Sequence, residues 1–519
     1  MEIQHWRPGV GRAVSAAALL TAAVTFAGPA RADAAMDAAI EALVPDLEAY
    51  IEKGMAEFDA PGVAMGIVSG DRLVWSQGFG TASKGGAAVD TDTIFQIGST
   101  TKAFLATTIA IAVDEGRLAW DDRVVDRYEP GFQMKDPWVT QEFRVLDLLA
   151  QRSGMPPAAN DALGFLGVPP EGMVHAMRNV EPVSSFRTTF AYTNVTHMLA
   201  GDIVAEAMGA PDWASVVTTE IVEPLGMTRT SLTEEAIEAA ENATIGHRYT
   251  PEGSVEVPFT PLFPYAFQGA GAINSTVNDL VPWVRLQLSG GMHDGTRIVS
   301  EENLAVTKIP RIGMAPTAGY AMGWLQQSTP NGLITWHNGG TTGYGAYIGL
   351  LAAHDVAVIV LTNLQNVGLP DAIGEWTFDR LLGNPEVDHA AAKLAAAKAA
   401  AARLDKVFTR PENPSPSPAA AGLAGSYFNP SLGAVELSVE GEELTLLVSG
   451  TGARLALAPW NGDAFTVTIV PEGRFGAIAA NLGPLPVGFA QFRVNGDGVV
   501  SGFDFVLQED GQTLPFERN

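Results

Sequence analysis

A serine and a lysine three residues apart are the first pair in this chain that could do covalent chemistry. Ser99 and Lys102 occur in the run Ser-Thr-Thr-Lys, and a strongly apolar stretch from Ala103 to Val113 follows them. This stretch predicts a buried helix that ends before Gly116, where glycine suits a C-terminal cap. Residues three apart share one face of a helix, so the hydroxyl and the amine would be neighbours. Burial disfavours a charged ammonium, and a neutral Lys102 could then accept the proton of Ser99.

The Ser-x-x-Lys spacing decides little alone, because it is expected by chance in many chains of this length. Two further motifs follow it, Tyr192-Thr193-Asn194 and His337-Asn338-Gly339-Gly340, and the second of these lies between strand-like segments. The identity, order and separation of the three motifs carry more information than the first one does.

These three motifs resemble those of class C serine β-lactamases and of the related penicillin-binding and D-peptidase families. The segments 148–156, 223–227 and 270–276 are also similar to connecting segments of that superfamily. The resemblance covers about residues 38–385. It implies an α+β fold like that of class C β-lactamases, in which an antiparallel sheet is flanked by helices and accompanied by an all-helical region.

The resemblance implies catalytic roles for three residues. Ser99 would be the acylated nucleophile, Lys102 its proton acceptor, and Tyr192 a second base that also protonates the leaving group. A phenol with a reference pKa near 10 can do so if Lys102 and the field of the site lower that pKa. The alternative for Tyr192 is a core tyrosine whose hydroxyl binds a backbone group.

The resemblance also implies substrate-binding positions. Asn194 would donate a hydrogen bond to the acyl-side amide of the substrate, unless its side chain caps the following helix. Gly340 would supply the second oxyanion N–H beside that of Ser99, and Gly339 belongs to the same His-x-Gly motif. His337 stands where β-lactamases of this group typically carry lysine, so a permanent positive charge is missing. The alternative for His337 is a strand histidine that serves the structure only.

Composition excludes several classes of function. Among 519 residues there are 58 acidic and 31 basic ones, and the formal net charge of −27 would be repelled by a phosphate backbone, so we expect no nucleic-acid partner. The absence of cysteine excludes disulfides and thiolate nucleophiles. The eight histidines are scattered and form no H-E-x-x-H motif, so we expect neither a metal nor another cofactor. No G-x-S-x-G elbow occurs, which excludes an α/β-hydrolase.

The first 32 residues have the pattern of a signal peptide. Arg7 and Arg12 precede an uncharged run from Ala13 to Ala27, and a small-x-small pattern ends at Ala32. The run is shorter than the ~20 residues needed to span a bilayer. We therefore expect cleavage near Ala32 and a periplasmic or secreted protein that has no membrane association afterwards, the alternative being an uncleaved anchor.

The rest of the chain divides into three stretches. Residues 33–385 mix helical periodicity with short β-rich runs, of which 357–361 is apolar throughout as a central strand would be. Residues 386–418 contain an alanine-rich helix and a proline-rich linker. Residues 419–519 alternate strand-like runs with turn signals, which predicts a small antiparallel barrel or half barrel. This last stretch resembles the lipocalin-like domain appended to some peptidases of the superfamily, where it is implied to restrict access to the cleft, and the alternative is a passive stability module.

Three hypotheses for function follow. The first is an exported peptidase or amidase that cleaves small peptides, including D-residue-containing, cell-wall or nonribosomal types, through an acyl-enzyme on Ser99. The second is a carboxylesterase or weak β-lactamase. The third is a catalytically silent peptide-binding protein, against which the intact set of Ser99, Lys102 and Tyr192 argues. The resemblance also leaves room for a homo-oligomer, since the appended domain sometimes covers the cleft of a neighbouring subunit.

Overall fold

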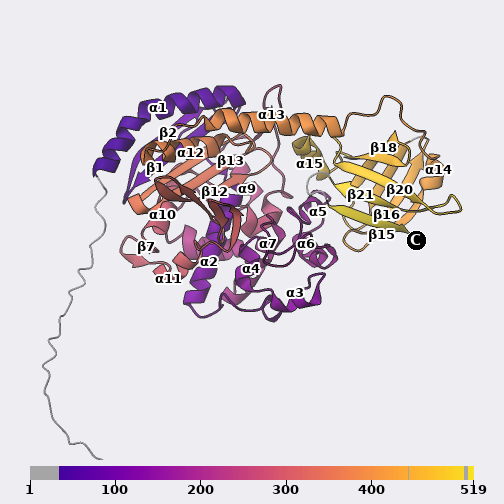
Figure 1. Cartoon of the computed structure of the whole chain (residues 1–519), viewed down its shortest axis with the longest axis horizontal. Coiled ribbons are helices and arrows are strands. Elements are labelled where there is room, and N and C mark those ends of the chain that lie inside the picture. Colours follow the sequence, from indigo (N-terminus) through magenta and orange to yellow (C-terminus); the bar gives the residue numbers. More distant parts are fainter. Residues whose placement is uncertain (1–33, 442, 508–511) are drawn as a thin grey trace, which may run out of the picture.

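An eight-stranded antiparallel sheet forms the centre of the larger part of the molecule (Figure 1). The computed structural model describes residues 34–441, 443–507 and 512–519. The strand order is β2-β1-β14-β13-β12-β11-β10-β9. The strands are β1 (Gly62–Ser69), β2 (Arg72–Gly80), β9 (Ile312–Ala315), β10 (Ala318–Tyr320), β11 (Leu325–Thr329), β12 (Gly332–Gly340), β13 (Gly345–Leu351) and β14 (Val356–Thr362).

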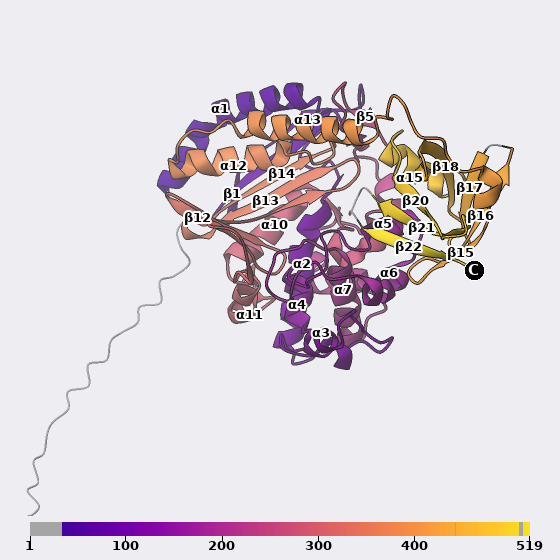
Figure 2. The same cartoon turned by 45° about the vertical axis from the view of Figure 1, so that its right-hand side comes forward.

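Helices cover both faces of this sheet. One face carries α1 (Ala34–Phe58) and α12 (Leu369–Leu382), with α13 (His389–Val407) beside them, and the other carries α10 (Val277–Leu288) (Figures 1 and 2). Beyond α10 lies a mainly helical region centred on α2 (Thr101–Asp114) and α7 (Val195–Met208). Its shorter helices are α3 (Pro137–Glu142), α4 (Val145–Leu149), α5 (Asp161–Phe165), α6 (Pro170–Ala176) and α8 (Trp213–Val217). Two further short helices are α9 (Glu234–Glu238) and α11 (Glu301–Val306).

Short elements connect these layers. The 3-10 helices are η1 (Gly98–Thr100), η2 (Val124–Asp126), η3 (Met177–Asn179), η5 (Tyr265–Ala270) and η6 (Ala352–His354), and η4 (Thr218–Val222) is a π-helix. The two-stranded pairs are β3 (Phe95–Gln96) with β6 (Asn274–Ser275), β4 (His247–Arg248) with β5 (Val255–Glu256), and β7 (Met292–His293) with β8 (Thr296–Arg297).

Strand β14 lies inside the sheet and is buried on both faces. It pairs with β1 on one side and β13 on the other. Val358 and Val360 pack with α1 and α12, whereas Ile359 packs with the helices of the opposite face, because successive strand residues point to opposite sides. The prediction of a central strand from the apolar run 357–361 is confirmed.

Helix α2 is also buried, as its apolar sequence predicts. Every residue from Thr101 to Ala112 is buried, and the helix ends at Asp114, with Gly116 in the left-handed conformation at φ 69°. Phe104 of α2 stacks on Trp283 of α10 with ring centroids 3.7 Å apart. The helix that starts next to Ser99 is therefore fixed by tertiary packing over almost its whole length.

The chain ends in a closed eight-stranded antiparallel barrel. This confirms the predicted barrel, closed rather than half open. Its strands are β15 (Gly425–Asn429), β16 (Gly433–Glu440), β17 (Glu443–Val448), β18 (Arg454–Asn461), β19 (Ala464–Ile469), β20 (Gly488–Val494), β21 (Val500–Leu507) and β22 (Thr513–Arg518). Helix α14 (Ala420–Leu423) precedes the barrel, and α15 (Phe475–Leu482) lies between β19 and β20.

The barrel packs against the helical region (Figure 2). Arg474, just before α15, donates a hydrogen bond to the Gly167 carbonyl, and Asn481 of α15 donates one to the Pro258 carbonyl at 3.1 Å. Buried residues of the barrel and of the helical region belong to one hydrophobic cluster. The two parts are therefore in direct contact as well as joined by α13 and the extended segment after it.

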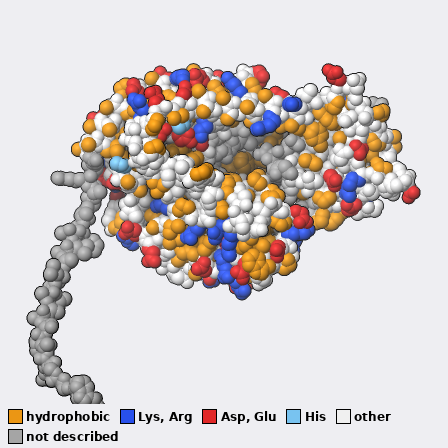
Figure 3. Space-filling model, in the orientation of Figure 1, with side chains coloured by type: hydrophobic (Ala, Val, Ile, Leu, Met, Phe, Trp, Pro, Cys, Tyr) orange, Lys and Arg blue, Asp and Glu red, His pale blue; other side chains and the backbone are white. Residues whose placement is uncertain are grey.

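The surface carries charges of both signs. Figure 3 shows acidic and basic side chains interspersed over the face drawn there, without one patch that gathers the negative charge of the chain. Across the described ranges 34–441, 443–507 and 512–519, we find no helix that combines the length and the apolar character needed to cross a bilayer.

The packing of α2 leads to a stability prediction. Phe104→Ala is expected to lower the free energy of unfolding by about 3 to 5 kcal/mol, because it removes a fully buried aromatic ring. Phe428→Ala is the matched control, since that ring is 48% exposed and its loss should change stability by no more than about 0.5 kcal/mol. Urea unfolding followed by tryptophan fluorescence measures both, and equal effects would contradict the packing analysis.

Candidate active site

The turn that carries Ser99 and the strand β12 come unusually close together. Ser99 lies in η1, directly before α2. A Cβ on Gly339 would lie 1.9 Å from the Ile97 carbonyl oxygen and 3.2 Å from the Ser99 backbone nitrogen, and a Cβ on Gly98 would lie 2.6 Å from the Gly340 nitrogen. Only glycine permits this approach, which places the backbone of Gly340 beside the serine.

The Lys102 amine is fully buried and has three polar neighbours. Its Nζ lies 3.0 Å from Ser99 Oγ, 2.7 Å from Asn194 Oδ1 and 2.7 Å from the Ala270 carbonyl oxygen. A neutral amine has two hydrogens and one lone pair. When both hydrogens go to the two carbonyl-type oxygens, the lone pair is left to accept the Ser99 hydroxyl.

Burial sets the protonation state of this amine. Desolvation lowers the pKa of Lys102 to about 7, although the Asp161 carboxylate acts in the opposite direction. At neutral pH a substantial fraction of Lys102 is therefore uncharged and able to accept a proton. This is the electrostatic situation that the sequence predicted from a lysine on a buried helix.

Tyr192 lies on the other side of the lysine. The Lys102 Nζ is 4.8 Å from the centre of its ring. Its hydroxyl is buried, and no described residue completes a hydrogen bond to it, so it is not a core tyrosine bound to a backbone group. Burial raises the pKa of Tyr192 well above its ordinary value, and the nearby Ser99 hydroxyl offsets this only in part. The condition that the site lowers this pKa is not met, because desolvation dominates, and the phenol stays protonated.

Asn194 precedes α7 but does not cap it. No side-chain capping bond is formed at this helix end. Its Oδ1 accepts from Lys102, and its Nδ2 donates to Asp161 Oδ2 at 2.7 Å. The amide is thus held between the Lys102 amine and the Asp161 carboxylate, and the alternative of an Asx cap does not apply.

His337 lies at the same site, but both of its ring nitrogens already have hydrogen-bond partners. Its side chain is 1% exposed, Nδ1 contacts the Asn338 carbonyl oxygen, and Nε2 lies 3.1 Å from the Tyr320 hydroxyl. Because a carbonyl can only accept, Nδ1 carries the hydrogen and Nε2 accepts from Tyr320. Burial, aided by Lys102, lowers the pKa of His337 to about 3. This pKa lies far below the ordinary histidine value of 6.5, so the ring is neutral.

Three neighbours of the site were not identified in the sequence. The Asp161 carboxylate comes from the start of α5, which carries no motif, and the Ala270 oxygen belongs to the backbone. Tyr320 lies on β10, 17 residues before His337. The sequence identifies the segment 270–276 only as a connecting segment. None of the three has a local signal, since each is recognised only by what folds against it.

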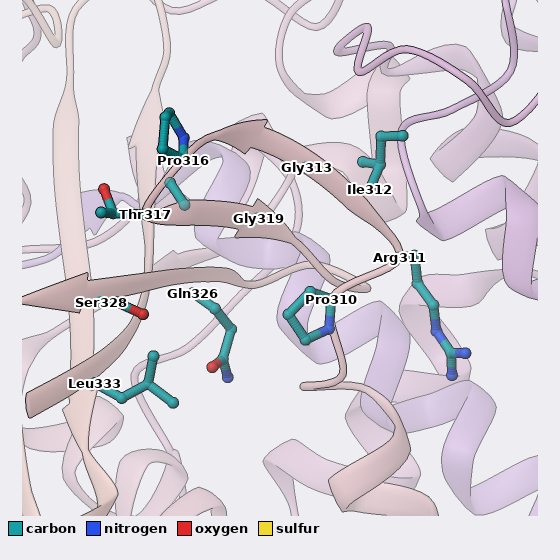
Figure 4. Close-up of a pocket in the computed structure, with 11 residues that line it drawn as sticks. Pro310, Arg311, Ile312, Gly313, Pro316, Thr317, Gly319, Gln326, Ser328 and Leu333 are labelled. Atoms are coloured by element: carbon teal, nitrogen blue, oxygen red, sulfur yellow. The ribbon is translucent and has the colours of Figure 1, made fainter.

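A shallow pocket elsewhere does not belong to this site. It is lined by residues of β9, β10 and β11 at one end of the sheet, by the segments next to β9 and by Leu333, and Figure 4 shows them around Pro310 and Gly319. None of the seven candidate site residues lines it. Within the part of the chain that the structure describes, no group of three or more His, Asp or Glu residues is arranged to hold a metal ion.

Comparison with known proteins agrees with this arrangement. The family model described as beta-lactamase matches residues 47–384, and a domain of unknown function, DUF3471, matches residues 409–518. The chain is 26% identical to unguisins hydrolase ungD of Aspergillus violaceofuscus, over 85% of this chain and 86% of that protein. It is 28% identical to penicillin-binding protein 4 of Amycolatopsis lactamdurans, over 72% of this chain and 94% of that protein.

A solved structure shows the same fold. The octameric penicillin-binding protein homologue from Pyrococcus abyssi superposes with a TM-score of 0.59 and 22% identity, covering 91% of this chain and all of that one. The family match spans more than half of the chain and includes all three motifs. The chain therefore belongs to the beta-lactamase and penicillin-binding-protein-like family of serine hydrolases.

Proposed function

We propose that this serine hydrolase cleaves amide bonds of small peptides through an acyl-enzyme on Ser99. The observation that carries the proposal is the contact between Ser99 Oγ and the buried Lys102 Nζ at 3.0 Å, with a lysine pKa of about 7. A nucleophile needs a base of this kind within hydrogen-bond reach. A protein that only binds peptides has no use for this matched pair.

Acylation begins with transfer of the Ser99 proton to Lys102 as Oγ attacks the substrate carbonyl carbon. The negative charge that develops on the carbonyl oxygen would be met by the backbone N–H groups of Ser99 and Gly340, which the glycine contacts bring side by side. Asn194 keeps one amide hydrogen beyond its bond to Asp161, and this hydrogen would bind the acyl-side amide of the peptide.

The leaving amine needs a proton before the carbon–nitrogen bond breaks. Tyr192 is the proposed donor, since its raised pKa keeps the phenol protonated at neutral pH. The proton that Lys102 took from Ser99 then restores the phenol. Water attacks the acyl-enzyme in the second half of the reaction, its proton passes to Lys102 and on to Ser99, and the carboxylic acid product leaves.

The state of His337 favours peptides over β-lactams. A β-lactam antibiotic carries a carboxylate, which a lysine at this position would hold by a charge-assisted hydrogen bond. The His337 ring is neutral, and both of its nitrogens are already engaged. Similarity to a protein named unguisins hydrolase supports hydrolysis as the activity. The proposed substrates are D-residue-containing, cell-wall or nonribosomal peptides.

Export, domain limits and assembly are proposed on separate grounds. The proposed signal peptide, residues 1–32, falls outside the described residues. The proposed division into a hydrolase domain (33–385), a connecting helix and linker (386–418) and a barrel domain (419–519) follows the elements of the fold. The relative from Pyrococcus abyssi is octameric, which supports testing this chain for a homo-oligomer.

Replacement of the nucleophile is the first test. Ser99→Ala is expected to reduce peptide-amide hydrolysis by at least about a thousandfold while leaving the melting temperature unchanged, because only a hydroxyl is lost. Lys102→Ala should be nearly as severe, and the double variant should be no worse than the worse single one, because both residues serve the same step. Steady-state kcat/KM values measure this, and substantial activity in Ser99→Ala would refute the assignment.

The pH dependence of activity tests the base. Protonated Lys102 cannot accept a proton, so kcat/KM should rise with pH through an apparent pKa near 7 and then level off. His337, whose pKa lies at about 3, should contribute no further step near neutrality. A profile recorded from about pH 5 to 9 on one peptide substrate checks this, and a rate that is flat or falls across pH 7 would contradict it.

Substrate charge tests the role of the third motif. Short peptide amides, including ones with D-residues, are expected to exceed nitrocefin in kcat/KM by at least about tenfold. Because position 337 offers no cation to bind the β-lactam carboxylate, a cephalosporin and its methyl ester should be hydrolysed at similar rates. Faster turnover of nitrocefin than of every peptide, or a strong loss on esterification, would favour the β-lactamase alternative.

A further inference from the structure

We infer that Asp161 is a positioning residue of this site, which orients Asn194 and Lys102, and that the barrel holds Asp161 in place through Gln512. The inference rests on the proposed function of Ser99 and Lys102. Asp161 begins α5 and is 8% exposed. Its Oδ2 accepts a hydrogen bond from Asn194 Nδ2 at 2.7 Å, and Asn194 Oδ1 in turn accepts one from Lys102 Nζ.

The charge of Asp161 fixes which way the Asn194 amide faces. An ionised carboxylate can only accept hydrogen bonds, so it selects the NH2 end of the amide. The oxygen end is then directed at Lys102, which uses one hydrogen there and keeps its lone pair for Ser99. A neutral group at position 161 that both donates and accepts would permit the flipped amide, whose NH2 group would face the lysine hydrogens.

The same carboxylate acts on the protonation of the lysine. Among the described residues, Tyr192, His197 and His337 are the other titratable groups around Lys102, and burial keeps all three uncharged near neutral pH. Asp161 is the anion that favours the ammonium form, against the desolvation that disfavours it. Removing its charge should therefore lower the pKa of Lys102 further.

A residue of the barrel supports Asn160, which directly precedes Asp161 and α5. Asn160 adopts the left-handed conformation at φ 69°, and its side-chain Nδ2 donates to the Met173 carbonyl oxygen at 2.9 Å. Gln512, just before β22, contacts it twice: Gln512 Oε1 accepts from the Asn160 backbone nitrogen at 3.3 Å, and Gln512 Nε2 donates to Asn160 Oδ1 at 3.2 Å. The barrel thus forms two hydrogen bonds with Asn160, the residue next to Asp161.

The test uses a fluorophosphonate, which labels an activated serine whatever the natural substrate is. The rate of Ser99 labelling is measured by intact mass over a pH series for the full chain and for three variants. Asp161→Asn should shift the acid limb of the labelling rate to lower pH by about half a unit or more. Gln512→Ala should shift it in the same direction by less, because the carboxylate is only loosened.

Asp202→Asn is the matched control. It makes the same change on α7, where the carboxylate interacts with Glu171 and Tyr128 rather than with Lys102, and it should leave the limb unchanged. Melting temperatures check folding, and Asp161→Ser replaces Asp161→Asn if the latter does not fold. If the acid limb of the labelling rate does not shift in the Asp161 variant, the whole inference is overturned. If it does not shift in Gln512→Ala, the proposed role of the barrel is overturned. Wild-type protein that is not labelled on Ser99 at any pH overturns the proposed function instead.

Discussion

The burial of one amine is the constraint on which the site depends. Lys102 is fully buried on α2, and an isolated ammonium in such a place would be strongly destabilised. The amine makes three polar contacts, which come from three separate segments: η1, the residue before α7 and the end of η5. These contacts satisfy a neutral amine completely. The elements around the lysine therefore serve both to stabilise it and to orient its lone pair.

The second requirement is close backbone approach, which the sheet supplies. β12 pairs with β11 over residues 332–336 and with β13 over residues 335–340, so its end at Gly340 is held by β13. Gly339 and Gly98 carry no side chain and let this strand touch the turn that holds Ser99. A paired strand end on one side and a buried helix on the other therefore place the two N–H groups of the proposed oxyanion site.

The sequence predicts the elements better than it predicts the contacts between them. The central strand 357–361, the buried helix after Ser99, the alanine-rich helix and the final barrel follow from periodicity, apolar runs and turn residues, which are local properties. The pKa of Lys102 follows as well, because helix burial alone determines its direction. The pKa values of Tyr192 and His337 do not follow from the sequence. Desolvation is the largest cause of both shifts, and only the packed structure shows how deeply the two side chains are buried. Asp161, Tyr320 and Ala270 reach the site from distant segments and have no sequence pattern of their own.

The charges of the whole chain and of the site act together on substrate choice. The chain carries a formal net charge of −27, and such a field disfavours the approach of anions. Within the site, the group that replaces the lysine of β-lactamases is neutral, the Lys102 amine is partly neutral at pH 7, and a carboxylate lies behind Asn194. No permanent cation among the described residues of the site compensates for the long-range repulsion. A neutral or cationic peptide meets neither barrier, so electrostatics at both length scales support the proposed preference for such substrates.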